Sequence, residues 1–166
     1  FGQRVTEYNS LKAALTTHGA IVGRKVRRQQ SLVKRLHVFA ASSPHDDNYY
    51  NKSIIHEFTV ATDNTLTIAT AISAGINDIY LSGVNYYRCG IGAIELANSQ
   101  FMQHDMFSAS DDNPELMHCY DGINNRYGND SLKVAAEGIN EKWHMRREFL
   151  SPSYTSKWRD IPKIVC

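Results

Sequence analysis

The stretch "LVKRLHVFAASSPHDDNYYNKSIIHEFTV", residues 32–60, decides the predicted fold. Its two ends, residues 32–41 and 53–60, are rich in β-branched and aromatic side chains, which favour strands. The middle, residues 42–51, is rich in Ser, Asp and Asn and contains a proline, which predicts a loop. Two strands therefore follow one another directly along the chain.

Two amphipathic helices are predicted, one before and one after this pair of strands. In both, apolar residues recur at the i, i+3/i+4 and i+7 spacing of a helix that buries one face. The first helix follows an expected N-cap at Thr6, and its apolar residues are Tyr8, Leu11, Leu15, Val22 and Val26. The second follows the cap sequence "TDN" at residues 62–64 and ends at Ser82–Gly83, and its predicted buried stripe is Leu66, Ala69, Ile72, Ile76 and Ile79.

Strands are also predicted at the two ends of the first hundred residues, over residues 1–5 and 85–96. Gly90 and Gly92 in the later strand allow a bulge or the close approach of another backbone. The resulting order, β-α-β-β-α-β, closes as a four-stranded antiparallel sheet with both helices on one face. The predicted class is α+β, and side chains on the open face either are solvated or contact a ligand.

The character of the sequence changes after the first hundred residues, so we expect a domain over 1–100, a linker over 101–112 and a small, mostly helical module over 113–166. The module starts with a helix capped by Asn113, whose expected apolar stripe is Leu116, Met117, Tyr120 and Ile123 and whose stop is Gly128. A strand is predicted over 131–139, followed by a helix that breaks at Pro152.

Charge is distributed unevenly along the chain. Residues 1–52 have a net charge of +6, residues 53–130 of −8 and residues 131–166 of +3. The basic front suits phosphate, whereas the acidic middle cannot bind the same polyanion. Four cations, Arg24, Lys25, Arg27 and Arg28, crowd the end of the first predicted helix, where they either complement the helix macrodipole or face phosphate.

Several functional classes are disfavoured. No apolar run of about 18 residues is present, so we expect no membrane span, and no signal peptide is visible. The three cysteines, Cys89, Cys119 and Cys166, are far apart and form no C-x-x-C, which fits a reducing cytosol rather than a disulfide framework or a zinc site. Because the chain begins at Phe1 with a predicted strand, we expect a fragment of a longer protein.

No catalytic signature is visible in this chain. It has no nucleophile elbow, phosphate-binding glycine loop, HExxH motif or paired-carboxylate signature, and its seven histidines are scattered singly. We therefore expect no metal site, no cofactor and no catalysis by this chain alone.

Basic and polar residues on or beside the predicted strands are the candidate nucleic-acid contacts. They are Gln3, Arg4, Lys34, Arg35, Lys52, Ser53 and Arg88. No aromatic pattern for stacking bases accompanies them, so they are expected to bind backbone phosphates, which position a protein without reading sequence. The alternative is that these residues are solvated strand edges.

A family resemblance joins these observations. The segments "FGQRVTEYNSLKAALTTH" (1–18), "YYRCGIGAIEL" (86–96) and "EGINEKWHMRREFLSPSYTSKWRDIPKI" (137–164) closely resemble the C-terminal part of UmuC-like proteins. These form a branch of the Y family of translesion DNA polymerases that includes the catalytic subunit of bacterial DNA polymerase V. The resemblance covers essentially the whole chain.

The resemblance implies a role for each part of the chain. The first hundred residues are similar to the little finger domain, which lies on primer–template DNA through its open sheet face, and this favours Arg4, Lys52, Ser53 and Arg88 as phosphate contacts. The carboxylates that hold magnesium belong to the polymerase palm, which is absent here. The last fifty residues are similar to a module of unassigned function.

A short peptide in the linker, "QHDMF" at residues 103–107, resembles the Gln-Leu-x-Leu-Phe peptides with which bacterial polymerases bind the sliding clamp. Gln103, Met106 and Phe107 match the first, fourth and fifth positions, and His104 departs from Leu at the second. Gln would anchor by its amide while Met and Phe fill an apolar pocket. The alternative is that Phe107 packs against the first helix of the module.

Three functions therefore compete at this point. The first is a DNA-holding module of a translesion polymerase. The second is an adaptor that mainly binds proteins, namely the clamp and the UmuD′ and RecA partners that the resemblance implies. The third is a complete enzyme of another type, which the missing catalytic residues disfavour.

Overall fold

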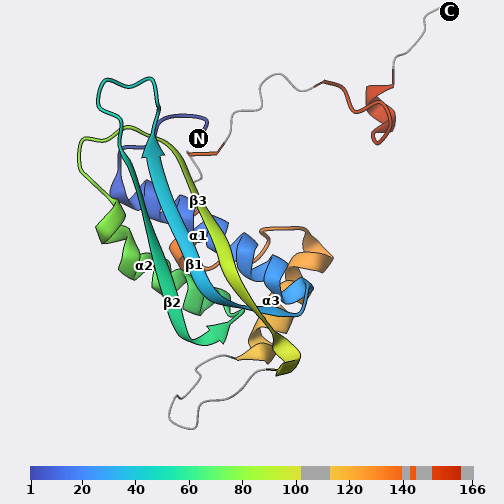
Figure 1. The fold of residues 1–166 in the computed structure, drawn as a ribbon. Helices are drawn as coiled ribbons and strands as arrows, with labels where there is room; N and C mark the ends of the chain where they lie inside the picture. The colour runs from blue at the N-terminus through green and yellow to red at the C-terminus, as the bar shows by residue number, and fades with distance from the viewer. Residues whose placement is uncertain (102–112, 140–142, 145–150, 162–166) are drawn as a thin grey trace, which may run out of the picture.

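The computed structural model describes residues 1–101, 113–139, 143–144 and 151–161. Its main elements are α1 (Tyr8–Arg28), β1 (Ser31–Ser42), β2 (Asn51–Thr62), α2 (Thr65–Ile79), β3 (Tyr86–Asn98) and α3 (Pro114–Tyr127). Three short 3-10 turns add η1 (Ser99–Phe101), η2 (Ala135–Glu137) and η3 (Trp158–Asp160). Figure 1 shows the sheet in front of α1 and α2, with α3 beside the C-terminal end of α1.

The strands form one antiparallel sheet in the order β2-β1-β3. In the central strand, Val38 lies opposite Ile54 of β2 and Ile91 of β3. Helices α1 and α2 cover one face of the sheet, and the other face is open (Figure 1). The α+β class and the placement of both helices on one face are confirmed.

The sheet has three strands, so the prediction of a fourth strand over residues 1–5 is wrong. Only Val5 pairs, exchanging hydrogen bonds of 3.0 and 2.8 Å with Tyr86. A strand that packs on a core needs alternate buried side chains. Two positions before buried Val5, however, stands Gln3, which is polar and exposed, and Gly2 donates to the carbonyl of Trp143 instead. The pairing therefore stops at a single bridge.

Three local predictions also needed correction. Leu66, expected in the buried stripe of α2, is 42 % exposed, and Ile68 is buried in its place. The cap of α1 is Glu7 rather than Thr6. Residues 131–139 contain a 3-10 turn and no strand, because the Glu137 carboxylate folds back to accept a hydrogen bond from the Val134 N–H (2.8 Å).

The caps of the other helices agree with the sequence. The Asn64 side chain accepts from the Leu66 N–H at the start of α2, and Asn113 accepts from the Leu116 N–H at the start of α3. Gly128 follows α3 with a φ of +107°, a conformation that glycine adopts without strain.

Helices α1 and α2 approach each other closely at Gly19. A Cβ atom added there would lie 2.5 Å from Cδ1 of Ile72 and 3.2 Å from Cγ2 of Ile68, both buried in the core. The absence of a side chain at this position therefore sets how near the two helices can lie to one another.

We expect Gly19→Leu to lower the free energy of unfolding by about 1–3 kcal/mol, since it overfills the space between α1 and α2. Urea denaturation measures the change. Gly122→Leu is the matched control, because no atom lies within 4 Å of a Cβ added at that exposed helical position. Equal stability of the two variants would contradict the close packing.

Candidate nucleic-acid interface

The open face of the sheet carries a pair of stacked rings that was not predicted from the sequence. His37 and Phe39, two residues apart on β1, stack with ring centroids 5.7 Å apart. The Phe39 ring lies over Gly90 of β3, where an added Cβ atom would come within 2.7 Å of it. The close approach expected at Gly90 is thus made by a ring rather than by another backbone, and the alternation of His and Phe on β1 was the signal for it.

The seven predicted phosphate contacts fall into two groups at opposite ends of the sheet. Lys34 and Arg35 lie near the start of β1. At the other end, Lys52 pairs with Ala40, Ser53 with Phe39, and Arg88 with Ala41. Gln3 and Arg4 adjoin this second group, because the neighbouring Val5 bridges to Tyr86. About six residues of strand, roughly 20 Å, separate the two groups.

Three of the predicted basic residues already have partners. Lys34 donates to the carbonyls of Phe58 and Thr59, where the register of β1 and β2 shifts. Arg35 pairs with Glu57 of β2 and Glu95 of β3 at 3.1 and 3.3 Å. The start of β1 therefore carries little uncompensated positive charge.

The third is Arg4, which pairs with Asp46 of the β1–β2 loop at 2.6 Å. Its side chain is 47 % exposed, and exposed ion pairs of this kind contribute about 0–1 kcal/mol, so an incoming phosphate can replace the carboxylate at small cost.

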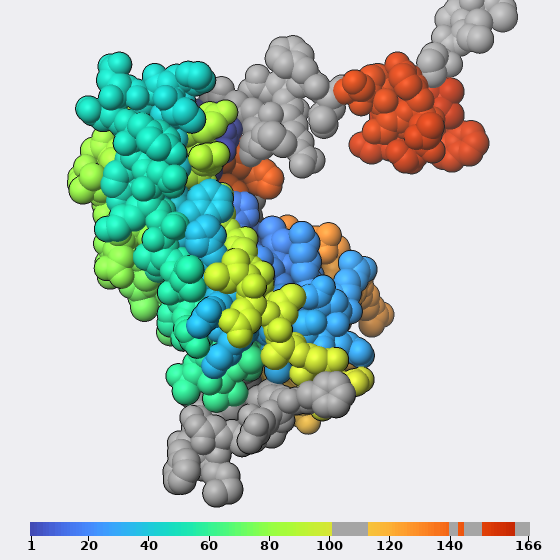
Figure 2. Space-filling model, viewed as in Figure 1, coloured from blue at the N-terminus to red at the C-terminus, as the bar shows by residue number. Residues whose placement is uncertain are grey.

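The remaining four residues form the more accessible group. Gln3, Lys52, Ser53 and Arg88 are exposed, and their side chains have no hydrogen bond or ion pair within the described part of the chain. Figure 2 shows the open face on which the side chains of all three strands are uncovered. These four of the seven predicted residues lie at the end of the sheet nearest the β1–β2 loop, but not on one face: Ser53 pairs with Phe39 on the open face, whereas Lys52 pairs with buried Ala40 on the helix-covered face.

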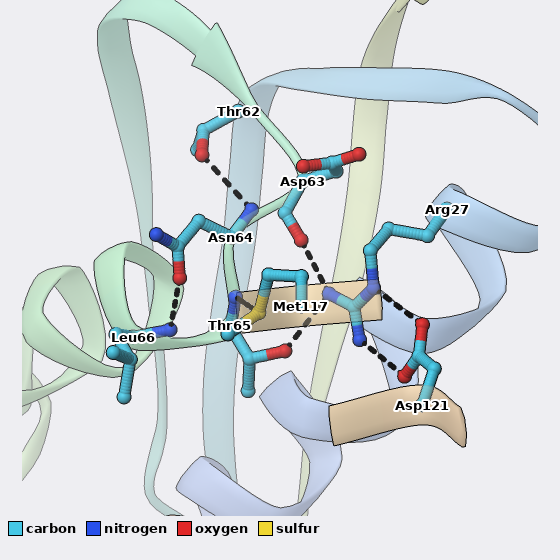
Figure 3. Close-up of polar contacts among 8 residues, drawn as sticks. All are labelled: Arg27, Thr62, Asp63, Asn64, Thr65, Leu66, Met117 and Asp121. Carbon is cyan, nitrogen blue, oxygen red and sulfur yellow. Dashed lines mark hydrogen bonds and ion pairs between the residues drawn. The ribbon is translucent and has the colours of Figure 1, made fainter. Parts of the chain in front are cut away.

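Helix α3 is fixed to the first hundred residues by one guanidinium. Arg27 donates from Nε and Nη2 to the two carboxylate oxygens of Asp121, at 2.7 and 2.8 Å. Its Nη1 donates to the carbonyl of Asp63 and to Oγ1 of Thr65, at the start of α2 (Figure 3). The Arg27 side chain is only 10 % exposed, so these partners satisfy a nearly buried charge.

Two further contacts hold the module against α1 and α2. The Met117 side chain is buried, and its sulfur accepts from the Thr65 N–H at 3.4 Å (Figure 3). Beyond α3, the Glu137 side chain is buried against α1, where the Thr17 hydroxyl contacts it. Residues 113–139 therefore pack on the first hundred residues, a point that the sequence left open.

The linker between the two parts has both of its ends held by ordered elements. It leaves the short turn η1 at Phe101, and it enters α3 at Asn113. The predicted clamp peptide, Gln103, Met106 and Phe107, lies within this linker and outside the described residues. Its alternative, packing of Phe107 on α3, also concerns residues that the structure does not describe.

Reactive groups are few in the described ranges. Across residues 1–101, 113–139, 143–144 and 151–161, no three His, Cys, Asp or Glu side chains gather as a metal site would require. Burial raises the pKa of the Cys89 thiol to about 12, so this thiol stays protonated at neutral pH and is a poor nucleophile. Within the same ranges, no helix is long and apolar enough to cross a membrane.

Comparison with known proteins identifies the family. Residues 1–106 match the impB/mucB/samB family C-terminal domain, and residues 114–164 match a domain of unknown function (DUF4113). The chain belongs to the impB/mucB/samB family, which confirms its resemblance to the C-terminal part of Y-family translesion polymerases.

The relatives of this chain are longer proteins. It is 33 % identical to Protein MucB of Salmonella typhimurium and 29 % identical to Protein SamB of the same organism, in each case over 98 % of its length. It is 27 % identical over 99 % of its length to Protein UmuC of Salmonella typhimurium strain LT2. It spans only 39–40 % of the length of these relatives.

The docking of the module should depend on pH through Glu137. Burial raises the pKa of this carboxyl above its ordinary value of 4.5, so the folded chain holds the proton more tightly than the unfolded chain does. Its stabilising contribution is therefore fully present below about pH 4.5 and is lost as pH rises through the raised pKa. We expect Glu137→Gln, which keeps the oxygen that accepts from Val134, to be more stable than the parent at pH 7.

Urea denaturation of the parent and the variant between pH 4.5 and 7.5 measures this dependence. The matched control is Glu115→Gln, because Glu115 is exposed in the first turn of α3. A difference between parent and Glu137→Gln that stays constant across this range would show that Glu137 does not titrate with folding.

Proposed function

We propose that this chain is the DNA-holding and clamp-tethering part of an error-prone translesion polymerase, acting in SOS mutagenesis and DNA repair in the bacterial cytoplasm. The observation that carries the proposal is the open sheet face with the exposed, unpaired side chains of Ser53 and Arg88 at one end, where Gln3 and Lys52 lie beside them at the sheet's margin. Family membership supports it, because the matched region is the C-terminal domain of longer proteins that resemble Y-family polymerases.

The geometry of the sheet suits the backbone of duplex DNA. Side chains of one face of a sheet stand in rows, so Ser53, Phe39 and Gly90 lie side by side across the three strands. A surface of this kind can rest along a primer–template duplex, with Arg88 of β3 reaching phosphates from the open face and the long side chain of Lys52 reaching them around the β2 edge of the sheet. Contacts to phosphate position the duplex without selecting its sequence, which is what a polymerase requires.

The absence of a side chain at Gly92 also favours close contact. A Cβ atom at Gly92 would meet nothing within 4 Å, so this part of β3 presents backbone alone. The stacked His37 and Phe39 rings lie beside it and offer an apolar surface to a deoxyribose. Phosphate would thus be bound at the end of the sheet and sugar near its middle.

The clamp tether rests on the linker peptide. Gln103, Met106 and Phe107 match three of the five positions of clamp-binding peptides, and the linker that contains them runs between two ordered ends, at Phe101 and Asn113. A sliding clamp is therefore the proposed protein partner of this segment.

A second candidate function is that of an adaptor for protein partners such as the clamp, UmuD′ and RecA. The observation that favours it is the number of large apolar side chains exposed on the sheet: Ile55 is 62 % exposed, Ile94 55 % and Tyr87 51 %. Salt distinguishes the two functions, because phosphate binding weakens steeply as salt rises, whereas apolar docking does not.

Catalysis is assigned to the part of the polymerase that this chain lacks. We propose that the parent protein is a DNA-directed DNA polymerase whose palm holds the magnesium ions that the transfer of a nucleotide requires. The role of this chain is then to hold the product of that reaction.

The first prediction concerns duplex DNA. The double variant Lys52→Ala, Arg88→Ala should bind a fluorescent primer–template duplex more weakly than the parent, with the salt dependence reduced by about 0.9 for each phosphate that the variant no longer neutralises. Fluorescence anisotropy from about 50 to 200 mM salt measures both quantities. The control is Arg126→Ala, which removes one positive charge from the exposed face of α3 and leaves the sheet unchanged. Binding that does not respond to salt would contradict the phosphate interface.

The second prediction concerns the clamp. The triple variant Gln103→Ala, Met106→Ala, Phe107→Ala should lose binding to a bacterial sliding clamp, while its Tm stays near that of the parent. Surface plasmon resonance and a thermal melt measure the two effects. The control is Ser108→Ala, Ser110→Ala in the same linker.

The opposite pair of results would assign these side chains to the core of the chain itself. In that case the melt would show a destabilisation of about 3–5 kcal/mol, which is typical of a buried Phe replaced by Ala, and clamp binding would survive.

A further inference from the structure

A polar cleft lies on the helical side of the molecule, between the C-terminal end of α1 and helix α3. Its volume is about 560 Å³. Arg24, Lys25 and Arg28 line it from α1, and His118, Asn125 and Asn129 line it from α3 and the residues just after it. It exists because Arg27 and Asp121 hold the two helices together at its base.

Positive charge in this cleft exceeds negative charge. The carboxylates of Asp63 and Asp121 are part of the lining, and Asp121 is bound by Arg27. Lys25 and Arg28 are exposed, and neither side chain has a hydrogen bond or an ion pair within the described part of the chain. These two side chains lie one turn apart on α1, so they repel each other while no anion is present.

Two of the last four backbone carbonyls of α1 are satisfied without these cations. The carbonyl oxygens of Lys25 and Arg27 accept hydrogen bonds from the backbone N–H groups of Gln29 and Gln30, at 3.2 and 3.0 Å. The complementarity of basic side chains to the helix macrodipole remains, but it is a weak and exposed effect. This macrodipole effect does not explain why α3 and the residues after it supply amide and imidazole groups opposite the same cations.

The facing wall completes a set of hydrogen-bond donors. Arg24 donates to the Oδ1 atom of Asn129 at 2.9 Å, which leaves the amide N–H groups of Asn129 for another acceptor. Asn125 and His118 are exposed on α3, about two helical turns apart. An anion between the walls would therefore meet cations from α1 and amide and imidazole groups from the α3 side.

We propose that this cleft binds the phosphate backbone of a single nucleic-acid strand. Arginine and lysine at its mouth suit phosphate, because a guanidinium can donate two parallel hydrogen bonds to one phosphate group. A single strand can bend into a recess between two helices, whereas a rigid duplex needs an extended surface such as the sheet. The cleft uses none of the residues assigned to duplex binding.

The test uses the whole 166-residue chain and a fluorescent oligo(dT) of about 12 nucleotides, within the site sizes typical of single-strand binding. The double variant Lys25→Ala, Arg28→Ala should bind this strand at least tenfold more weakly at low salt, with the salt dependence reduced by about 0.7 for each phosphate that the variant no longer neutralises. Its affinity for the primer–template duplex should change less than twofold. The variant Lys52→Ala, Arg88→Ala should show the reverse pattern, and a thermal melt checks that both variants fold.

Two results would overturn the proposal. One is oligo(dT) binding by Lys25→Ala, Arg28→Ala that equals that of the parent. The other is that Lys25→Ala, Arg28→Ala weakens the binding of a poly-glutamate peptide of equal charge more than it weakens the binding of oligo(dT). The cleft would then be a site for an acidic protein. A third result separates the two sites. If Lys52→Ala, Arg88→Ala leaves duplex binding unchanged while Lys25→Ala, Arg28→Ala weakens oligo(dT) binding, the proposed sheet interface is wrong and the proposed cleft site is supported.

Discussion

The guanidinium of Arg27 is the contact on which the arrangement of the described parts depends. It joins the end of α1 to the start of α2 and to α3, through Thr65, the carbonyl of Asp63 and the carboxylate of Asp121. A charge with so little exposure is tolerated only when it is paired and hydrogen-bonded, and here four hydrogen bonds engage all three guanidinium nitrogens. Removal of the Asp121 carboxylate would leave the guanidinium buried without its counter-ion, which favours detachment of α3.

Because α3 is held in this way, the two faces of the molecule acquire different chemical characters. The sheet face is flat and nearly neutral at the start of β1, where Arg35 lies between Glu57 and Glu95. The helical side contains the recess lined by Arg24, Lys25 and Arg28. Much of the excess positive charge of residues 1–52 therefore lies in this recess, and less of it lies on the sheet than the sequence suggested.

Sequence alone predicted those features that depend on local patterns. The existence of α1 and α2, the caps Asn64 and Asn113 and the stop at Gly128 all depend on neighbouring residues, and the structure has them where expected, although Ile68 replaces Leu66 in the buried stripe of α2. Prediction failed where the local structure depends on a contact with residues far away along the chain. The single bridge at Val5 depends on Tyr86, and the turn at residues 135–137 depends on the burial of Glu137 against α1.

The candidate site was predicted in the same uneven way. The exposed residues Lys52, Ser53 and Arg88 could be placed on strands from their sequence, but the pairing of Arg4 with Asp46 could not, because it joins segments far apart along the chain. The basic run in α1 was visible from the start, yet only the docking of α3 shows that it forms one wall of a recess.

The fixed ends of the linker also set a length scale. Covalent geometry alone places every residue between Phe101 and Asn113 within about 20–22 Å of one of these two positions, because about six residues of chain can span no more than that. A protein that grips this segment would keep the sheet within that radius, which corresponds to a high effective concentration of the sheet near whatever its partner encircles. A partner bound to residues 102–112 would thus restrict the region in which the folded part of this chain can search.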